Sequence, residues 1–80
     1  MIPIDPRFMN ARSWAAQTGN ILEPYGNIPV LVNDEDWKQW AADITLLPAI
    51  ANLLPARPEG FLRWEDWANA FNETVLLLDI

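Results

Sequence analysis

The carboxylates at residues 34–40, which read DEDWKQW, are the first candidates for chemistry in this chain. Three acids stand in a row there, and a related phrase, WEDW, returns at residues 64–67. Paired carboxylates can serve as general acid and base, but Asp34 and Asp36 lie two positions apart, about 200° around a helix. These two cannot share one proton, so a pair formed between two helices, such as Asp36 with Asp66, is the carboxylate dyad that stays open.

The rest of the sequence offers little for catalysis or metal binding. The chain contains no Cys and no His, so the common nucleophile–base arrangements, zinc sites and disulfides are absent. The stretch NDEDW lacks the glycine and the distant glutamate of a calcium loop. We therefore expect a protein that is not an enzyme, with no catalytic residue, metal, cofactor or small-molecule substrate.

The start of a helix explains the acids without any chemistry. Asn33 can cap a helix whose first turn holds Asp34, Glu35 and Asp36, where acids meet the positive end of the helix dipole. The apolar residues that follow have the spacing of one helical stripe: Trp37, Trp40, Ala41, Ile44 and Leu47. We predict a helix at residues 34–47.

A second acidic start introduces the last predicted element. Glu65 and Asp66 precede an apolar stripe that continues to Leu78, which predicts a helix at residues 62–78. Its last residues, TVLLL, are β-branched and apolar enough to form a strand instead. Between the two helices, the prolines in residues 48–60 indicate a short helix and a loop.

The N-terminal part of the chain has a different pattern. Pro3 and Pro6 favour an extended arm at residues 1–5, and Asp5 followed by Pro6 is typical of a helix start. We predict a helix at residues 6–18 that ends at Gly19. Two β-prone runs around the PYGN turn predict a hairpin at residues 21–32. The expected fold is α+β, mostly helical, in a single domain of residues 1–80.

The acidic helices also raise the question of an internal repeat. A shift of thirty positions aligns residues 35–37 with residues 65–67, both of which read EDW. Two amphipathic helices with acidic starts would acquire this likeness by convergence, and that interpretation is favoured over duplication.

Composition and charge narrow the class of partner. The net charge is −6, and residues 1–33 hold as many acids as bases, so the excess lies in residues 34–80. Clustered bases, which nucleic acids and anionic membranes attract, are lacking. No apolar run reaches the ~18 residues of a membrane span, and the N-terminus does not resemble a signal peptide. We expect synthesis in a cytoplasm, with no nucleic-acid or membrane partner.

The aromatic residues point to a protein partner. Five tryptophans in 80 residues are many, because each can bury about 150–250 Å² and a domain of this size has a small interior. We expect Trp37 and Trp67 to face inward. The residues expected to form an interface are Trp40, Trp64, Tyr25 and Phe61, together with Ile2 and Ile4 of an arm that can add a strand to a neighbour.

With its Trp-rich acidic helices and its opening IPIDPRF, the chain resembles the small accessory structural proteins encoded among the virion genes of tailed bacteriophages. The resemblance implies a short, Cys-free, non-enzymatic protein that docks on larger head or tail proteins. Such a protein would be made in the host cytoplasm and would reside in the virion, in the tail or at the head–tail connection. Its partners would be other virion structural proteins in a symmetric assembly.

Two other functions fit the same residues. An acidic inhibitor could imitate DNA phosphates and occupy a basic nucleic-acid-binding protein, and a cytoplasmic adaptor could bind one transient partner. Salt separates the inhibitor from the virion protein, because acidic mimicry weakens as ionic strength rises while apolar docking persists.

Overall fold

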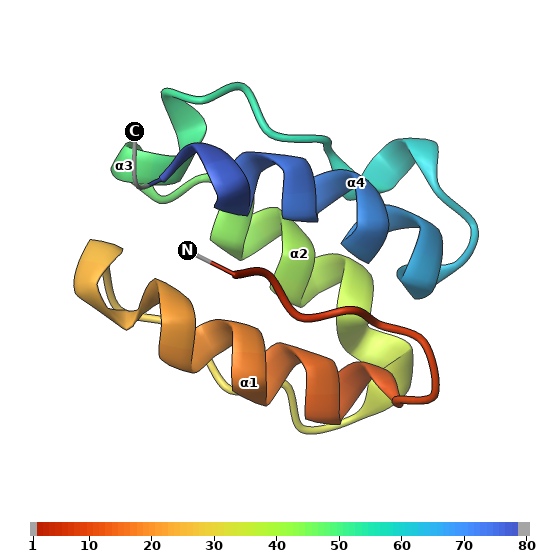
Figure 1. The fold of residues 1–80 in the computed structure, drawn as a ribbon. Helices are drawn as coiled ribbons and strands as arrows, with labels where there is room; N and C mark the ends of the chain where they lie inside the picture. Colours follow the sequence, from red (N-terminus) through yellow and green to blue (C-terminus); the bar gives the residue numbers. More distant parts are fainter. Residues whose placement is uncertain (1, 79–80) are drawn as a thin grey trace.

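The structure, a computed structural model, describes residues 2–78, and the only regular elements in that range are helices and single 3-10 turns. No strand occurs in that range, so the predicted α+β class and the hairpin at 21–32 are wrong. Figure 1 shows the helices. Their bounds are α1 Ala11–Leu22, α2 Trp37–Thr45, α3 Pro48–Ala51 and α4 Trp64–Leu77, with single 3-10 turns at Glu23–Tyr25, Asp34–Asp36 and Pro58–Gly60.

The first helix begins five residues later than residue 6, where we predicted its start. Asn10 caps it, since its side-chain oxygen accepts a hydrogen bond of 2.8 Å from the backbone N–H of Ser13. Asp5 instead accepts from the N–H of Arg7 at 2.9 Å. Pro6 is fully buried, so the arm that carries it stays extended and packs on the core.

Gly19 lies inside α1 and does not end it. A Cβ at this position would lie 3.2 Å from Cγ2 of Ile28, so the glycine makes room for the chain to return along the helix. Leu22, which we assigned to a strand, is buried on the same side of α1 as Trp14 and Thr18. Burial at helical spacing therefore outweighs the β propensity of this stretch.

The two predictions with acidic starts are confirmed in type and differ at their ends. Residues 34–36 form a 3-10 turn that leads into α2, whose buried side chains are Trp40, Ala41, Ile44 and Thr45. The stretch TVLLL belongs to α4, which runs to Leu77 and is not a strand. Pro48 opens α3, as the prediction of a short helix required.

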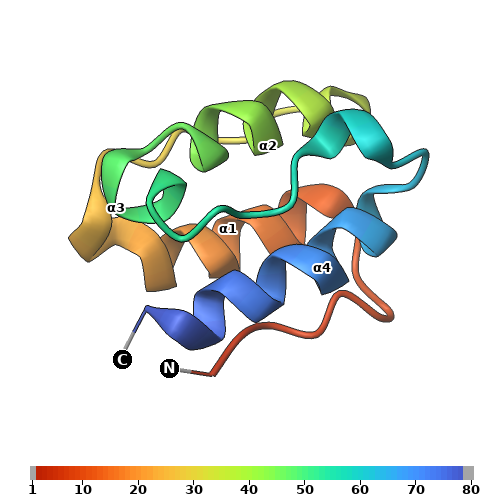
Figure 2. The ribbon, with the colours of Figure 1, turned by 90° about the horizontal axis from the view of Figure 1, so that it is seen from above.

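Helices α1, α2 and α4 all run in the same direction (Figures 1 and 2). Parallel helices need connections that travel back along their length, and residues 26–33 and 52–63 do this between the long helices. Residues 2–10 run in the same backward direction before α1 (Figure 1). We call these three stretches the first, second and third return segments; they comprise residues 2–10, 26–33 and 52–63. Each return segment leads into the start of one long helix.

The core has an approximate threefold repeat that joins each return segment to the helix after it. The indole N–H of Trp14 donates to the carbonyl of Ile4 at 2.8 Å. Equivalent bonds join Trp40 to Pro29 and Trp67 to Ala56, at 2.8 and 2.9 Å. A buried alanine follows each of these tryptophans: Ala15, Ala41 and Ala68. The indoles therefore satisfy their own buried donors and hold the return segments in place.

The same three indoles meet at the centre of the molecule. Their ring centroids are 5.8 Å apart for Trp14 and Trp40, 5.6 Å for Trp14 and Trp67, and 6.1 Å for Trp40 and Trp67. All three pairs are edge-to-face, which is a favoured aromatic geometry. Trp67 therefore corresponds to Trp40 and not to Trp37, so the repeat that a shift of thirty suggested has the wrong register.

A stability prediction follows from one buried polar atom in this core. Thr18 occupies the position of Ile44 and Phe71 in the other two helices, and its hydroxyl has no hydrogen-bond partner among the described residues. We expect Thr18→Val to raise the free energy of unfolding by about 1 kcal/mol, because an unsatisfied buried hydroxyl is removed. Thr45→Val is the matched control, since that hydroxyl donates to Ala42 at 2.9 Å and its loss should lower stability. Thermal unfolding of both variants tests this, and equal shifts of one sign would contradict it.

Candidate protein-docking surface

The tryptophans predicted to anchor an interface lie largely in the core. Trp40 is 4% exposed, so its ring is not accessible to a partner and that part of the prediction is wrong. Trp64 is half-buried, with its centroid 6.1 Å from that of Trp14. Trp67 is buried as expected, and Trp37 is half-buried beside it, at 6.3 Å. The interior thus accommodates more indole surface than the sequence suggested.

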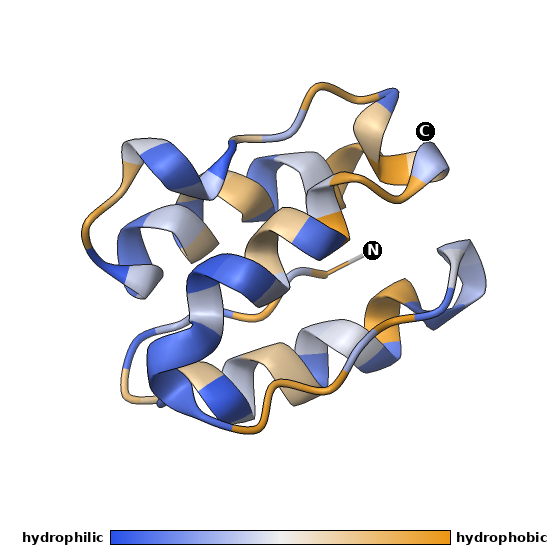
Figure 3. Ribbon diagram, turned by 180° about the vertical axis from the view of Figure 1, so that it is seen from behind, coloured by the Kyte–Doolittle hydropathy of each residue, from blue (hydrophilic) through white to orange (hydrophobic). Residues whose placement is uncertain are grey.

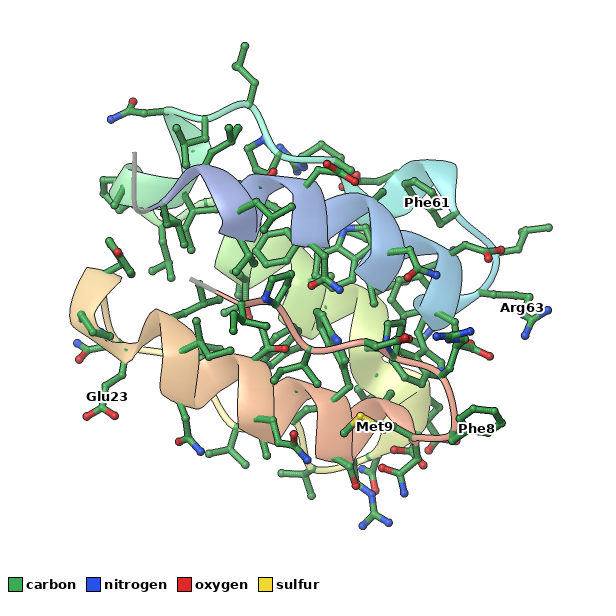
Figure 4. All side chains as sticks on the ribbon, in the orientation of Figure 1. Phe8, Met9, Glu23, Phe61 and Arg63 are labelled. Atoms are coloured by element: carbon green, nitrogen blue, oxygen red, sulfur yellow. The ribbon has the colours of Figure 1, made fainter. Side chains whose placement is uncertain are left out.

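The other four predicted interface residues are dispersed. Tyr25 is half-buried, and its hydroxyl donates to the carbonyl of Leu78 at 3.4 Å. Phe61 is half-buried against the core near the start of α4 (Figure 4). Ile4 is held inside the fold, because its carbonyl accepts from Trp14 and also from Asn72 at 2.8 Å. Ile2 is exposed. These residues do not form one surface.

Apolar surface is exposed mainly outside the aromatic core. The large hydrophobic side chains that face solvent come from the return segments and from the ends of α2 and α4. They are Ile2, Phe8, Val30, Val32, Leu46, Leu54, Leu62, Leu76 and Leu77. Single exposed apolar residues are common in proteins, and contiguous apolar patches are the ones that mark interaction sites. These side chains are therefore the candidates for a contact surface.

Two of these residues also have unusual backbone conformations. Phe8 has φ 64° and is 102% exposed, and Leu54 has φ 54° and is 89% exposed. Bulky residues avoid positive φ because Cβ crowds the backbone. They are the only non-glycine residues with positive φ in residues 2–78. Figure 4 shows Phe8 projecting away from the body of the molecule.

Three carboxylates pair with an arginine two residues away, and Asp34 pairs with Arg12 of α1 at 3.4 Å. A hydrogen bond from the Arg7 side chain lowers the pKa of Asp5, and one from Arg63 lowers the pKa of Glu65. The pKa of Glu59 is lowered chiefly by its own backbone N–H. A general acid needs a raised pKa, and these three shifts go the other way. In residues 2–78, no three acidic side chains gather as metal ligands would.

A shallow groove lies on the surface where the second return segment packs along α1. Its volume is about 580 Å³, within the ~300–1,000 Å³ range of small-molecule sites. One wall is lined by residues of α1, among them Ala16 and Gly19, and by Glu23 just after it, and the other wall is residues 26–31.

The exposed residues with strained backbone were missed by sequence reasoning. Phe8 appeared as an apolar position of a helix, and Leu54 as part of a short helix. Positive φ at a non-glycine residue leaves no mark in residue type or spacing. The β-prone second run of the expected hairpin, IPVLV at residues 28–32, was the one available signal of an apolar edge.

Comparisons with known proteins identify no relative. The sequence matches no protein-family model and no curated protein, and the fold matches no solved structure. The resemblance to phage virion proteins therefore stays a prediction. No helix within residues 2–78 has the length and apolar character to cross a bilayer.

Proposed function

We propose that this chain is a non-enzymatic structural protein of a phage virion that docks on larger head–tail or tail proteins. The observation that carries the proposal is the pair of exposed apolar side chains on left-handed backbone, Phe8 and Leu54. Each such conformation costs of order 1–3 kcal/mol. A solvated side chain returns none of this free energy in the isolated protein, whereas a partner that buries it does.

The remaining exposed apolar residues support the same function. Phe8 and Leu62 precede α1 and α4 by two or three residues, and Leu46, Leu76 and Leu77 lie at the ends of α2 and α4. Because these helices run in the same direction (Figure 1), apolar residues occur toward both ends of the molecule. Apolar residues at both ends allow contacts with more than one neighbour, as a component placed between larger proteins requires. A small domain also gains stability from each partner that binds only its folded state.

Replacing Phe8 with glycine tests the proposal. We expect Phe8→Gly to raise the free energy of unfolding of the isolated protein by about 1 kcal/mol, because glycine adopts positive φ without strain. The same change should weaken docking, since the exposed ring is removed. Leu62→Gly is the control for stability: Leu62 is equally exposed but is not among the positive-φ residues, so glycine there should give no gain.

Incorporation into particles is the functional measurement. Quantitative mass spectrometry of purified virions of the phage that encodes the chain should find it at a fixed copy number, and Phe8→Gly should lower that number. Absence of the unmodified protein from virions would overturn the proposal. Contact that persists at high ionic strength supports apolar docking, and contact that collapses supports the acidic inhibitor.

A further inference from the structure

The three return segments are structurally equivalent, and this allows them to be compared position by position. In each segment, one carbonyl accepts the hydrogen bond of a core indole: Ile4, Pro29 or Ala56. Two residues after that carbonyl, each segment buries a side chain. These side chains are Pro6, Leu31 and Pro58. The residues one and three positions after the carbonyl face solvent in all three segments.

Those two exposed positions hold an ion pair in the first and third return segments. Asp5 and Arg7 are paired at 2.8 Å in the first segment, and Arg57 and Glu59 at 3.2 Å in the third. The signs of the charges are reversed between the two segments, so what they share is a charged and strongly solvated outer face.

The second return segment has two valines at the same positions. Val30 is 84% exposed and Val32 is 69% exposed. The segment also contains one proline, Pro29, where the first and third contain two each. Charged side chains and prolines are the features that prevent an extended edge from pairing with another chain. The second segment lacks this protection, although the first and third segments show that the fold can accommodate charged residues at these positions.

The backbone of the second segment has an open edge. Within the described chain, residues 27–32 make no backbone–backbone hydrogen bond, and the carbonyl of Pro29 is taken by Trp40. In an extended chain the N–H and C=O of one residue point to one edge, and successive residues alternate. The edge that faces Trp40 therefore includes Pro29, which has no N–H to offer. The other edge presents the complete backbone groups of Ile28, Val30 and Val32.

We propose that this edge pairs with the same edge of a second copy of the chain, forming an antiparallel two-stranded ribbon with Val30 at the twofold axis. Figure 3 shows the segment on the surface, running along α1. The sequence IPVLV is β-prone, so each copy supplies the kind of strand that the other edge accepts. Ile28 of one copy would lie opposite Val32 of the other.

The distribution of charge favours a second copy at this place. The chain carries a net charge of −6, so two copies repel one another over most of their surface. Residues 24–33 contain no charged side chain, which makes this stretch a suitable point of contact. A ribbon of this length buries little area, so we expect a weak, concentration-dependent dimer that strengthens as salt screens the charges. This inference is independent of the docking role of Phe8.

Sedimentation of the whole chain over a range of concentrations tests the proposal. We expect the apparent mass to double as concentration rises and to do so earlier at high salt. The double variant Val30→Asp with Val32→Arg installs the ion pair of the first segment, and it should weaken the dimer about tenfold or more, because like charges would meet at the axis. Val30→Thr with Val32→Thr is the control, since it keeps β-branched, uncharged side chains and should still dimerise. Circular dichroism should show both variants folded.

Cysteine cross-linking places the contact. The chain has no cysteine, so a disulfide in Val30→Cys can form only between copies, and Cα atoms of paired residues lie about 5.5 Å apart, within disulfide range. Asn69→Cys, at an exposed position of α4, is the control and should cross-link far more slowly. A chain that stays monomeric at all concentrations, a dimer unaffected by the charged double variant, or equal cross-linking at both sites would overturn the proposal.

Discussion

Trp67→Ala is expected to remove a large part of the stability of the fold. Trp67 contacts both other indoles of the central cluster and stacks on Phe71, with centroids 4.9 Å apart and planes at 23°. Its N–H also holds the third return segment through Ala56. Replacing a buried tryptophan with alanine costs about 3–5 kcal/mol, against roughly 4–12 kcal/mol for a domain of this length. Chemical denaturation followed by far-ultraviolet circular dichroism measures the loss.

Two further variants separate the contributions of Trp67. Trp67→Phe keeps an aromatic ring and removes the donor to Ala56, so its cost should fall between that of alanine and zero. Trp37→Ala removes a half-buried ring that has no indole hydrogen bond among the described residues, and it should cost clearly less than Trp67→Ala. If the alanine variants at 37 and 67 were equally stable, the central place of Trp67 in the core would be wrong.

The helices that sequence reasoning predicted correctly are those whose local and tertiary signals agree. Acids in the turn that leads into α2 and in the first turn of α4 predict a helix, and so does the apolar stripe that follows each of them. Local propensity and core packing therefore favour the same element. At residues 21–32 the signals conflict. In the sequence, Leu22 stands in a β-prone run beside a turn. In the fold it is helical, because it is buried on the same side of α1 as Trp14 and Thr18.

The candidate surface was harder to predict than the fold. Five tryptophans in a small chain suggested excess indole surface, but three of them find backbone carbonyls of the return segments as partners inside the core. Those carbonyls, at Ile4, Pro29 and Ala56, lie ten or eleven residues before their donors. The partner of a buried N–H depends on how the chain folds back, which residue type does not specify. The apolar excess is therefore carried by aliphatic side chains and Phe8.

Whether the sequence reveals the threefold repeat depends on which residues are aligned. The two EDW phrases, at residues 35–37 and 65–67, are identical in sequence. Their acidic side chains lie outside the core, however, so packing does not fix where in a repeat such acids occur. The residues under structural constraint are the Trp-Ala pairs at 14–15, 40–41 and 67–68. Aligned on these pairs, each unit begins with a proline-containing return segment and continues as a helix. Buried positions identify a repeat more securely than exposed ones do, because packing limits what can replace them.

Gly19→Val is expected to separate the second return segment from α1. The new Cβ would lie 3.2 Å from Cγ2 of Ile28, and valine adds two more carbons in the same crowded space. Overpacking of this kind costs about 1–3 kcal/mol, offset by a few tenths from the poor helix propensity of glycine. We expect a net loss of about 2 kcal/mol, which lowers the melting temperature by roughly 8–16 °C in a domain of this size.

The effect should be local as well as global. Ile28 adjoins Pro29, so a displaced segment loosens the hydrogen bond from the Trp40 indole to Pro29. The indole N–H of Trp40 should therefore exchange with solvent faster, while that of Trp67, which donates to Ala56, should change less. Gly60→Val is the matched control, since a Cβ there meets nothing within 4 Å, and it should leave stability almost unchanged. A Gly19→Val protein as stable as the Gly60→Val protein would mean that the segment does not pack closely on α1, and the open edge would lose the rigid support on which pairing depends.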